Sequence, residues 1–301
     1  MLFPISNIVM EDLADELFDQ KQVEVSVLRL DRIHKVVSGN KIFKLHYFLQ
    51  DAIQQSCEGI VSFGGAYSNH LVATAYACKE TGLKSTAIIR GEQPAILSPT
   101  LHACLEYGMT LKFISRLEYK NKDLPGFLNA LIPEHENYLV VPEGGYHPLG
   151  AAGAALIMEL MNDDTTHICS AVGTATTLSG LILGLRKKQQ IIGIPVLKNM
   201  HDLQQRITFL TNHPINPYEV KIMNFYHFGG YAKKKQELID FMNLLYQKHQ
   251  LPTDFVYTGK MMFGVIDCIK RDFFPKGSKI VCIHTGGIQG NSSLQPGTLV
   301  F

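Results

Sequence analysis

One lysine, Lys41, closes a short segment at 38–41 that also contains serine, glycine and asparagine. Three other segments, 64–70, 173–177 and 285–287, are rich in glycine, serine and threonine, and each follows an apolar run that predicts a strand. A turn of this kind presents free backbone N–H groups at a helix N-terminus, where anions bind. The chain therefore combines a potential nucleophile with several potential anion sites.

This combination favours one class of chemistry. A lysine amine forms a Schiff base with a carbonyl group, and backbone N–H groups hold a phosphate. Pyridoxal 5'-phosphate (PLP) carries both an aldehyde and a phosphate. The four segments therefore predict a PLP site in which Lys41 is the reacting amine.

The elements that must position these residues alternate along the chain. Apolar runs predict strands at 59–63, 85–90, 110–115, 138–141, 167–172, 191–196 and 279–284. Helical patterns occupy 69–81, 99–108, 148–161, 178–186, 202–211 and 233–249. Such alternation is typical of an α/β fold with parallel sheets covered by helices. Ligands of these folds bind at the carboxyl ends of strands, so the three glycine-rich segments are expected to converge on one cleft.

Composition excludes several other classes of protein. The 301 residues suffice for one large domain or two lobes, and 46% apolar with 18% charged residues is ordinary for a globular chain. A formal charge of +1 provides no field that would steer the chain to nucleic acid or to a membrane surface. No apolar run reaches the roughly 18 residues that a membrane span needs.

The cysteines and the N-terminus indicate a compartment. Six scattered cysteines without Cys-x-x-Cys spacing predict neither a metal site nor a disulfide framework, which fits a reducing cytoplasm. The start at 1–4 runs into Glu11 and Asp12 without a basic segment and a long apolar core, so no secretory signal is expected.

In their order, the segments resemble the PLP enzymes of the tryptophan-synthase β fold, and within them the branch of D-cysteine desulfhydrase and 1-aminocyclopropane-1-carboxylate (ACC) deaminase. The resemblance extends over 38–287, through stretches at 38–45, 62–70, 89–92, 142–145, 257–261 and 284–287. It implies a two-lobed α/β fold with mostly parallel sheets flanked by helices. A large cofactor-binding lobe would comprise 1–46 and 155–301, and a small lobe 47–154. The resemblance also implies a homodimer.

The same resemblance gives Lys41 two tasks, to form the Schiff base with PLP and to remove the α-proton of the substrate. An amine attacks an aldehyde only when it is neutral, and a dry pocket or a nearby cation lowers its pKa towards that state. Lys44, three residues further, is either such a cation or a surface residue. The alternative for Lys41 is an ordinary solvated lysine.

Residues after the first strand would contact the cofactor and the substrate. The resemblance assigns Asn69 to the phenolic oxygen of PLP and Ser68 to the substrate carboxylate, with a part in proton transfer. The unpaired N–H groups of the following helix suit a carboxylate as well. The alternative for both residues is a plain N-cap, and His70 is expected to be structural.

The segment 173–177 would hold the phosphate through the backbone of Gly173 and the residues after it, with hydroxyl groups from three threonines. Its other members are Thr174, Ala175, Thr176 and Thr177. Relatives usually have a denser glycine run, so Ala175 is a departure. The alternative is a strand-to-helix turn capped by threonine.

Aromatic and hydroxyl groups from the C-terminal half would complete the site. The resemblance makes Tyr257 the ring that stacks on the cofactor and Tyr231 a residue facing the substrate, and either hydroxyl could serve as acid or base. The alternative is two core tyrosines. Thr285 would face the pyridine nitrogen with a neutral hydroxyl. A neutral partner stabilises a carbanion less than a carboxylate does, which favours rapid loss of a β-leaving group.

The substrate follows from the same positions. ACC deaminases tend to have glutamate after the stacking tyrosine and leucine in the late glycine segment, whereas this chain has Thr258 and Thr285, the desulfhydrase pattern. Two departures are Ala66-Tyr67 and the tail at 288–301. We therefore expect a PLP-dependent β-elimination lyase that converts D-cysteine to pyruvate, hydrogen sulfide and ammonia.

Two alternatives stay open at this point. The first is ACC deaminase or an eliminase for another β-substituted small amino acid. The second is a PLP-free protein that binds an amino acid or a nucleotide. The dinucleotide version of that alternative lacks a Gly-x-Gly-x-x-Gly segment after an early strand.

Overall fold

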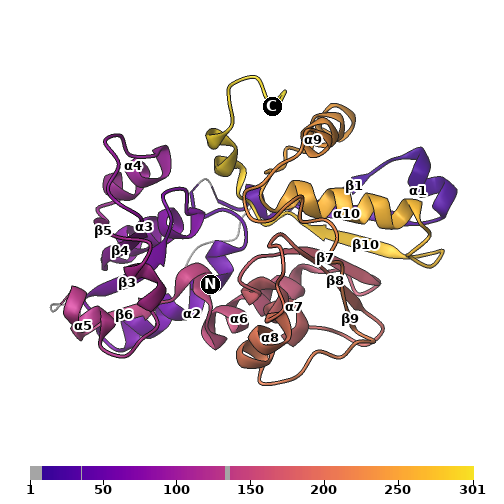
Figure 1. Ribbon diagram of the computed structural model, residues 1–301. Helices are drawn as coiled ribbons and strands as arrows, with labels where there is room; N and C mark the ends of the chain where they lie inside the picture. The colour runs from indigo at the N-terminus through magenta and orange to yellow at the C-terminus, as the bar shows by residue number, and fades with distance from the viewer. Residues whose placement is uncertain (1–8, 35, 133–135) are drawn as a thin grey trace.

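Two β-sheets organise the molecule, a computed structural model that describes residues 9–34, 36–132 and 136–301 (Figure 1). The larger sheet has six strands in the order β1-β2-β10-β7-β8-β9. Its strands are β1 (Met10–Leu13), β2 (Glu24–Leu28), β7 (His167–Val172), β8 (Gln190–Pro195), β9 (Val220–Ile222) and β10 (Lys279–Ile283). All neighbours pair in parallel except β1 with β2.

The smaller sheet has four parallel strands in the order β5-β4-β3-β6. They are β3 (Gly59–Gly64), β4 (Lys84–Arg90), β5 (Thr110–Ile114) and β6 (Tyr138–Val141). Every residue of β3 is buried, as expected for a central strand covered on both faces. The predicted α/β fold with mostly parallel sheets is confirmed.

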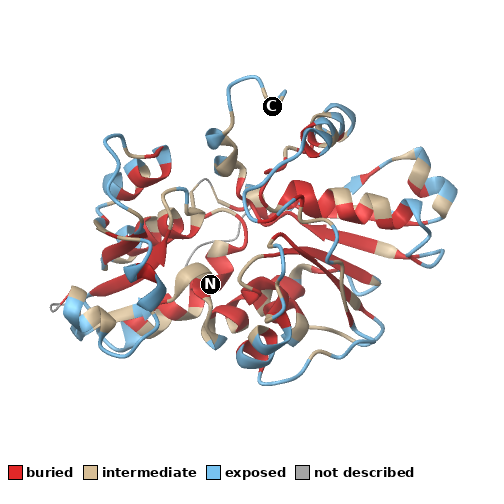
Figure 2. Cartoon of the chain, in the orientation of Figure 1, coloured by how far each residue is buried: buried red, intermediate tan, exposed pale blue. Residues whose placement is uncertain are grey.

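Helices flank both sheets and fill the space between them. They are α1 (Glu16–Lys21), α2 (Lys41–Gln54), α3 (Asn69–Thr81), α4 (Pro99–Glu106), α5 (Phe127–Leu131), α6 (Pro148–Ala155), α7 (Thr176–Leu183), α8 (Leu203–Thr211), α9 (Gln236–His249) and α10 (Thr258–Lys270). Short 3₁₀ helices are η1 (Leu30–Arg32), η2 (Glu118–Asn121), η4 (Glu143–Gly145), η5 (Leu156–Leu160) and η6 (Ile288–Ser293). The α2–α6–α7 packing joins the two sheets into one body, and burial is concentrated in the strands and these inner helices (Figure 2).

Local sequence explains why α3 has the predicted bounds. The Ser68 hydroxyl accepts a hydrogen bond from the Leu71 N–H and so caps the first turn. Gly82 ends the helix with a φ of 73°, the left-handed conformation that glycine adopts without strain. The strand β3 ends at Gly64, just before this cap, so the 64–70 segment lies at the carboxyl end of the smaller sheet.

Three predicted helices differ from the structure. The predicted helix at 148–161 is α-helical only to Ala155 and continues as the 3₁₀ helix η5. The helix predicted from Leu178 begins at Thr176, because Ala175 takes a left-handed conformation directly before it. The helix predicted from Lys233 begins at Gln236. The sequence pattern also left the helices α1, α2, α5 and α10 and the strands β1, β2 and β9 without a prediction.

The described helices include none that is both long and apolar enough to cross a membrane. The N-terminal segment 1–4, on which the expectation about a secretory signal rests, lies outside the described residues.

Candidate active site

The lysine segment packs directly against the late glycine segment. Gly39 has a φ of 71°, and a side-chain carbon there would overlap the Thr285 carbonyl oxygen, so only glycine fits. The Asn40 N–H donates to that same oxygen over 3.3 Å, and the Lys41 ammonium approaches it to 3.3 Å. These contacts fix the start of α2 at the carboxyl end of β10.

A second contact joins the lysine segment to the turn after β7. The Asn40 side-chain amide donates to the Thr177 hydroxyl over 2.7 Å, and both residues are buried. The Thr174 and Thr176 hydroxyls lie 2.9 Å apart, so the threonines of this turn form one cluster. Ala175 holds its left-handed backbone at a φ of 73°, a conformation that glycine would adopt more easily. Ala175 therefore replaces the glycine expected in this run, while the backbone still forms a tight turn directly before α7.

The small sheet contributes the residues at the start of α3. A side-chain carbon at Gly287 would lie 3.6 Å from the Asn69 amide nitrogen, which places Asn69 beside the late glycine segment. Ser68 uses its hydroxyl as the cap of α3, yet its side chain is only half-buried. Asn69 thus reaches the region of Lys41 from the opposite sheet, and Ser68 directly precedes it in the chain.

A second lysine of the same helix is also withdrawn from water. Lys44 is 8% exposed, and its ammonium donates to the Gly144 carbonyl over 3.2 Å. A side-chain carbon at Gly144 would lie 2.9 Å from the Thr174 methyl group, so this carbonyl lies against the threonine turn. Of the two roles considered for Lys44, a surface residue is excluded and a neighbouring cation fits.

Electrostatics follow from this burial. Burial lowers the pKa of Lys41 to about 8, and the negative charge of Asp254 opposes the shift. Burial lowers the pKa of Lys44 to about 7, with a further contribution from the positive charge of Lys41. The pKa of His70 falls to about 3, first through burial and then through Lys44 and Lys41. Lys41 is therefore neutral in an appreciable fraction of molecules near neutral pH, which is the state that attacks a carbonyl.

Two tyrosines contact each other beside the turn that follows β7. The ring centroids of Tyr231 and Tyr257 lie 6.0 Å apart at 71°, and Tyr257 lies against Gly173. Burial, followed by the neighbouring Tyr231, raises the pKa of Tyr257 well above its usual value. Tyr257 is held by Asp254, whose carboxylate accepts from the Tyr257 N–H over 2.8 Å and from the Thr258 N–H over 2.9 Å.

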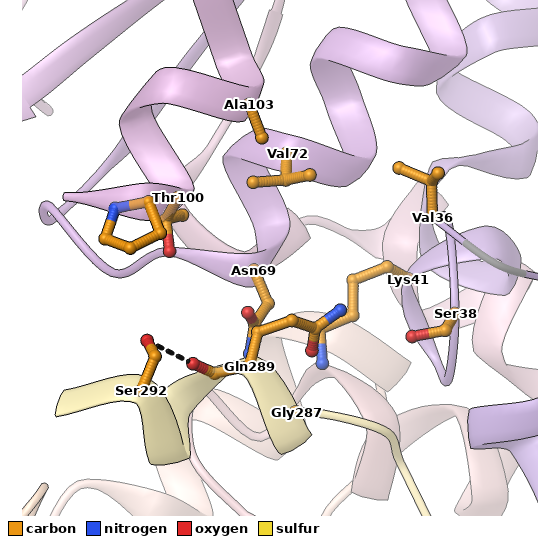
Figure 3. Close-up of a pocket in the computed structure, with 11 residues that line it drawn as sticks. Val36, Ser38, Lys41, Asn69, Val72, Thr100, Ala103, Gly287, Gln289 and Ser292 are labelled. Atoms are coloured by element: carbon orange, nitrogen blue, oxygen red, sulfur yellow. Dashed lines mark hydrogen bonds between the residues drawn. The ribbon is translucent and has the colours of Figure 1, made fainter. Parts of the chain in front are cut away.

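A cavity of about 300 Å³ opens beside Lys41 between the two sheets. Figure 3 shows Lys41, Asn69 and Gln289 close together in the middle of the view, with Val72 above them and Ser38 to the right. Other lining residues include Pro99, Thr100 and Ala103 from α4 and Ser292 from η6. The cavity lining therefore includes residues from three of the four predicted segments. The fourth, 173–177, does not line this cavity and adjoins it through the bond from Asn40 to Thr177.

The residues present fit a phosphorylated aldehyde. Within the described chain, the ammonium groups of Lys41 and Lys44 each donate to a backbone carbonyl and join no ion pair. Neither ring nitrogen of His70 has a hydrogen-bond partner there, nor has the buried Asn40 side-chain oxygen. Two buried amines, each protonated in a fraction of the molecules near neutral pH, lie close to a hydroxyl-rich turn and have no anionic partner among the described residues. A bound anion would stabilise their charged forms and offer acceptors to the unpaired polar atoms. A phosphate at the threonine turn would be such an anion.

Comparison with known proteins agrees with this geometry. The pattern of one protein family, described as "Pyridoxal-phosphate dependent enzyme", matches residues 13–286. The chain belongs to this family of PLP-dependent enzymes. Its cofactor is therefore PLP, and the alternative of a PLP-free binding protein no longer applies.

Individual relatives place the enzyme in one branch. It is 31% identical to a "Putative 1-aminocyclopropane-1-carboxylate deaminase" of Pyrococcus furiosus, over 89% of this chain and 85% of that protein. It is 27% identical to a "D-cysteine desulfhydrase" of Klebsiella pneumoniae, over 90% of this chain and 89% of that protein. Its structure matches that of an "ACC deaminase homologue" with a TM-score of 0.80 and 25% identity, over 97% and 92% of the two chains.

The sequence pattern does not reveal several residues of this PLP enzyme site. The pattern does not indicate Asp254, because this residue lies four positions before α10 and outside its N-cap position, although its carboxylate accepts from the Tyr257 N–H. Asn40 stands out only as a neighbour of the lysine, and its bond to Thr177 spans distant segments. Gln289 lies in the tail whose sequence departs from the family, and no motif includes it.

Proposed function

We propose that this PLP enzyme is a β-elimination lyase that converts D-cysteine and water to pyruvate, ammonia and hydrogen sulfide. One observation carries the proposal: the lowered-pKa amine of Lys41 lies in a cavity that also contains Asn69 and the start of α3. A base with a pKa near the working pH is suited to removing a proton from an α-carbon. When bound, PLP supplies an electron sink for the negative charge that this proton loss creates.

We assign the holding of the cofactor to residues of the large sheet. The turn from Gly173 to Thr177 would bind the phosphate through N–H and hydroxyl donors, and Lys44 would add a positive charge. Tyr257 would cover one face of the ring. Thr285 would face the ring nitrogen, and Asn69 would donate to the phenolic oxygen. Two hydrogen bonds from the Tyr257 and Thr258 N–H groups to Asp254 keep the covering tyrosine in position.

The substrate would be held by the small sheet and the rim of the cavity. The free N–H groups at the start of α3, together with the Ser68 hydroxyl, suit an amino-acid carboxylate. Tyr231 would face the substrate from the opposite side. Tyr231 is 48% exposed, so its side chain can approach a bound amino acid from the rim of the site.

The preference for a β-leaving group rests on the neutral hydroxyl of Thr285, the residue proposed to face the ring nitrogen. Thr285 is 5% exposed and carries no charge. Thr258, at the position where ACC deaminases have glutamate, is fully buried, and its hydroxyl donates to Asp254 over 2.7 Å. A glutamate at 258 would place a second carboxylate against Asp254, so the exchange of Thr258 to glutamate is disfavoured in this chain.

A comparison of two substrates tests the proposal. The PLP-loaded protein is incubated with D-cysteine and, separately, with ACC, and pyruvate, sulfide and 2-oxobutanoate are measured. We expect pyruvate and sulfide in equal amounts from D-cysteine and little 2-oxobutanoate from ACC. Faster release of 2-oxobutanoate would favour ACC deaminase, the second candidate, which the names of the Pyrococcus relative and of the matching structure support.

The lobe boundaries, the homodimer and the cytoplasmic location stay predictions. Light scattering of the PLP-loaded protein measures the oligomer directly.

A further inference from the structure

A third buried lysine, outside the reaction described above, lies on α10 one turn after Tyr257. Lys260 has no exposed surface. Its ammonium donates to the His227 carbonyl over 2.9 Å and to the Gly230 carbonyl over 2.8 Å. A buried ammonium is retained only where acceptors compensate for the lost water, and here both of these acceptors belong to one loop.

That loop has an unusual backbone. Gly229 and Gly230 have φ values of 96° and 120°, and Phe228 and Ala232 have φ values of 53° and 52°. The last two residues carry side chains, for which a left-handed backbone is strained. Such a conformation persists only when its surroundings hold it. The two hydrogen bonds from Lys260 fix the backbone at His227 and Gly230, within this strained segment.

The loop carries Tyr231, the residue proposed to face the substrate. Tyr231 follows Gly230 directly, and its ring centroid lies 6.0 Å from that of Tyr257. Tyr257 in turn directly precedes α10, the helix that carries Lys260. The start of α10 therefore positions Tyr257, and Lys260, one turn later on the same helix, binds the loop that carries Tyr231.

We propose that Lys260 is a positioning residue that fixes the 227–232 loop so that Tyr231 packs against Tyr257 and faces the substrate. The proposal depends on the proposed function in one respect only, that the substrate binds next to Tyr231. The bond between helix and loop is independent of which amino acid reacts.

The experiment compares Lys260→Met, which keeps the length of the side chain and removes its donors, with Lys260→Gln, which keeps N–H donors. Lys270→Met, at the exposed end of the same helix, is the matched control. Hydrogen–deuterium exchange of the 225–235 segment is measured in the PLP-loaded proteins. We expect exchange at 227–232 to rise at least tenfold in Lys260→Met, to rise less in Lys260→Gln and to stay unchanged in the control.

Kinetics provide a second readout that a merely structural role would not move. Lys260→Met is expected to retain the visible absorbance of the cofactor and to divide its loss between kcat and KM as Tyr231→Phe does. A protein with both Lys260→Met and Tyr231→Phe should then be no slower than the slower of the two single variants, because both changes remove the same contact of Tyr231 with the substrate.

Unchanged exchange in Lys260→Met overturns the proposal, as do losses that multiply in the double variant. Failure of both Lys260 variants to fold also overturns it, because Lys260 would then support the whole fold and not one loop. If the wild-type protein does not turn over D-cysteine, the proposed function fails, while the exchange measurement still decides the role of Lys260.

Discussion

The inner part of the site and its rim are built differently. The inner part, formed by Lys41, Lys44, Thr176 and Thr285, is largely withdrawn from solvent and tied to neighbouring segments by hydrogen bonds and close backbone packing. The rim, formed by Tyr67, Tyr231 and Gln289, is exposed, with Tyr67 at 50% and Tyr231 at 48%. The side chains of the inner part are constrained by several segments at once, whereas those of the rim extend from their loops towards solvent.

This difference separates two properties of the enzyme. A change in the inner part disturbs contacts among segments that lie far apart in sequence, so the chemistry common to the family is expected to depend on it. A change on the rim alters the surface that a substrate meets and few contacts of the fold. Of the residues that depart from the family pattern, Tyr67 and Gln289 lie on this rim, where they would tune the substrate preference, whereas Ala66 packs against the core of the small sheet.

The strongest test of the inner part is Lys41→Ala. Removal of the amine should abolish the visible absorbance of the bound cofactor and lower kcat by about a thousandfold or more, since it removes the proposed nucleophile and base. Absorption spectra and pyruvate release measure both effects. Lys270→Ala, at an exposed position, serves as the control. Pyruvate release at the wild-type rate by Lys41→Ala would refute the assigned role.

A glycine pair tests the close packing behind Lys41. Gly39→Ala should destabilise the protein by about 3 kcal/mol or more, because its methyl group meets the Thr285 carbonyl and its backbone is left-handed. Gly277→Ala has a similar φ of 80° with no atom within 4 Å, so about 1 kcal/mol is expected. Denaturant titration measures both. Equal losses would mean that the packing of Gly39 contributes nothing.

The second lysine gives a pH test. The pKa of Lys44 is about 7 in the folded chain and about 10.5 when unfolded, so the unfolded state binds more protons between these values. The cost of its buried charge is therefore fully present below pH 7 and is relieved as the pH rises. In the cofactor-free protein, Lys44→Met should raise the free energy of unfolding at pH 6 by on the order of a few kcal/mol and by less at pH 8.5.

Thermal unfolding at the two pH values checks this, with Lys276→Met at an exposed position as the control. The same Lys44→Met protein should bind PLP more weakly. A gain in stability that is the same at both pH values would show that the effect is not electrostatic.

The smallest effect is expected on the rim. Tyr67→Ala should change KM for the amino acid by roughly threefold to tenfold, with kcat and the visible absorbance nearly unchanged, because surface substitutions away from packed features cost little. Steady-state kinetics with D-cysteine and with ACC measure the change. Loss of the cofactor absorbance in this variant would place Tyr67 in the inner part and remove the distinction drawn above.

Local sequence determined much of this enzyme. The apolar run before Gly64, the serine cap and the glycine at 82 fix β3 and α3 within a residue of their predicted bounds, because these signals act between near neighbours in the chain. The glycine-rich turns identified the strand ends at which a site would lie, and the order of the segments identified the family.

Other features were decided only by the tertiary structure. Nothing near Lys44 in sequence says that it is buried, because the Gly144 carbonyl and the charge of Lys41 reach it only after folding. Likewise, the bonds from Lys260 to the 227–232 loop join residues about thirty positions apart. The sequence by itself determines where turns, caps and strands form, since these depend on neighbouring residues. The burial of charges and their partners depends on contacts between distant segments, which exist only in the folded chain.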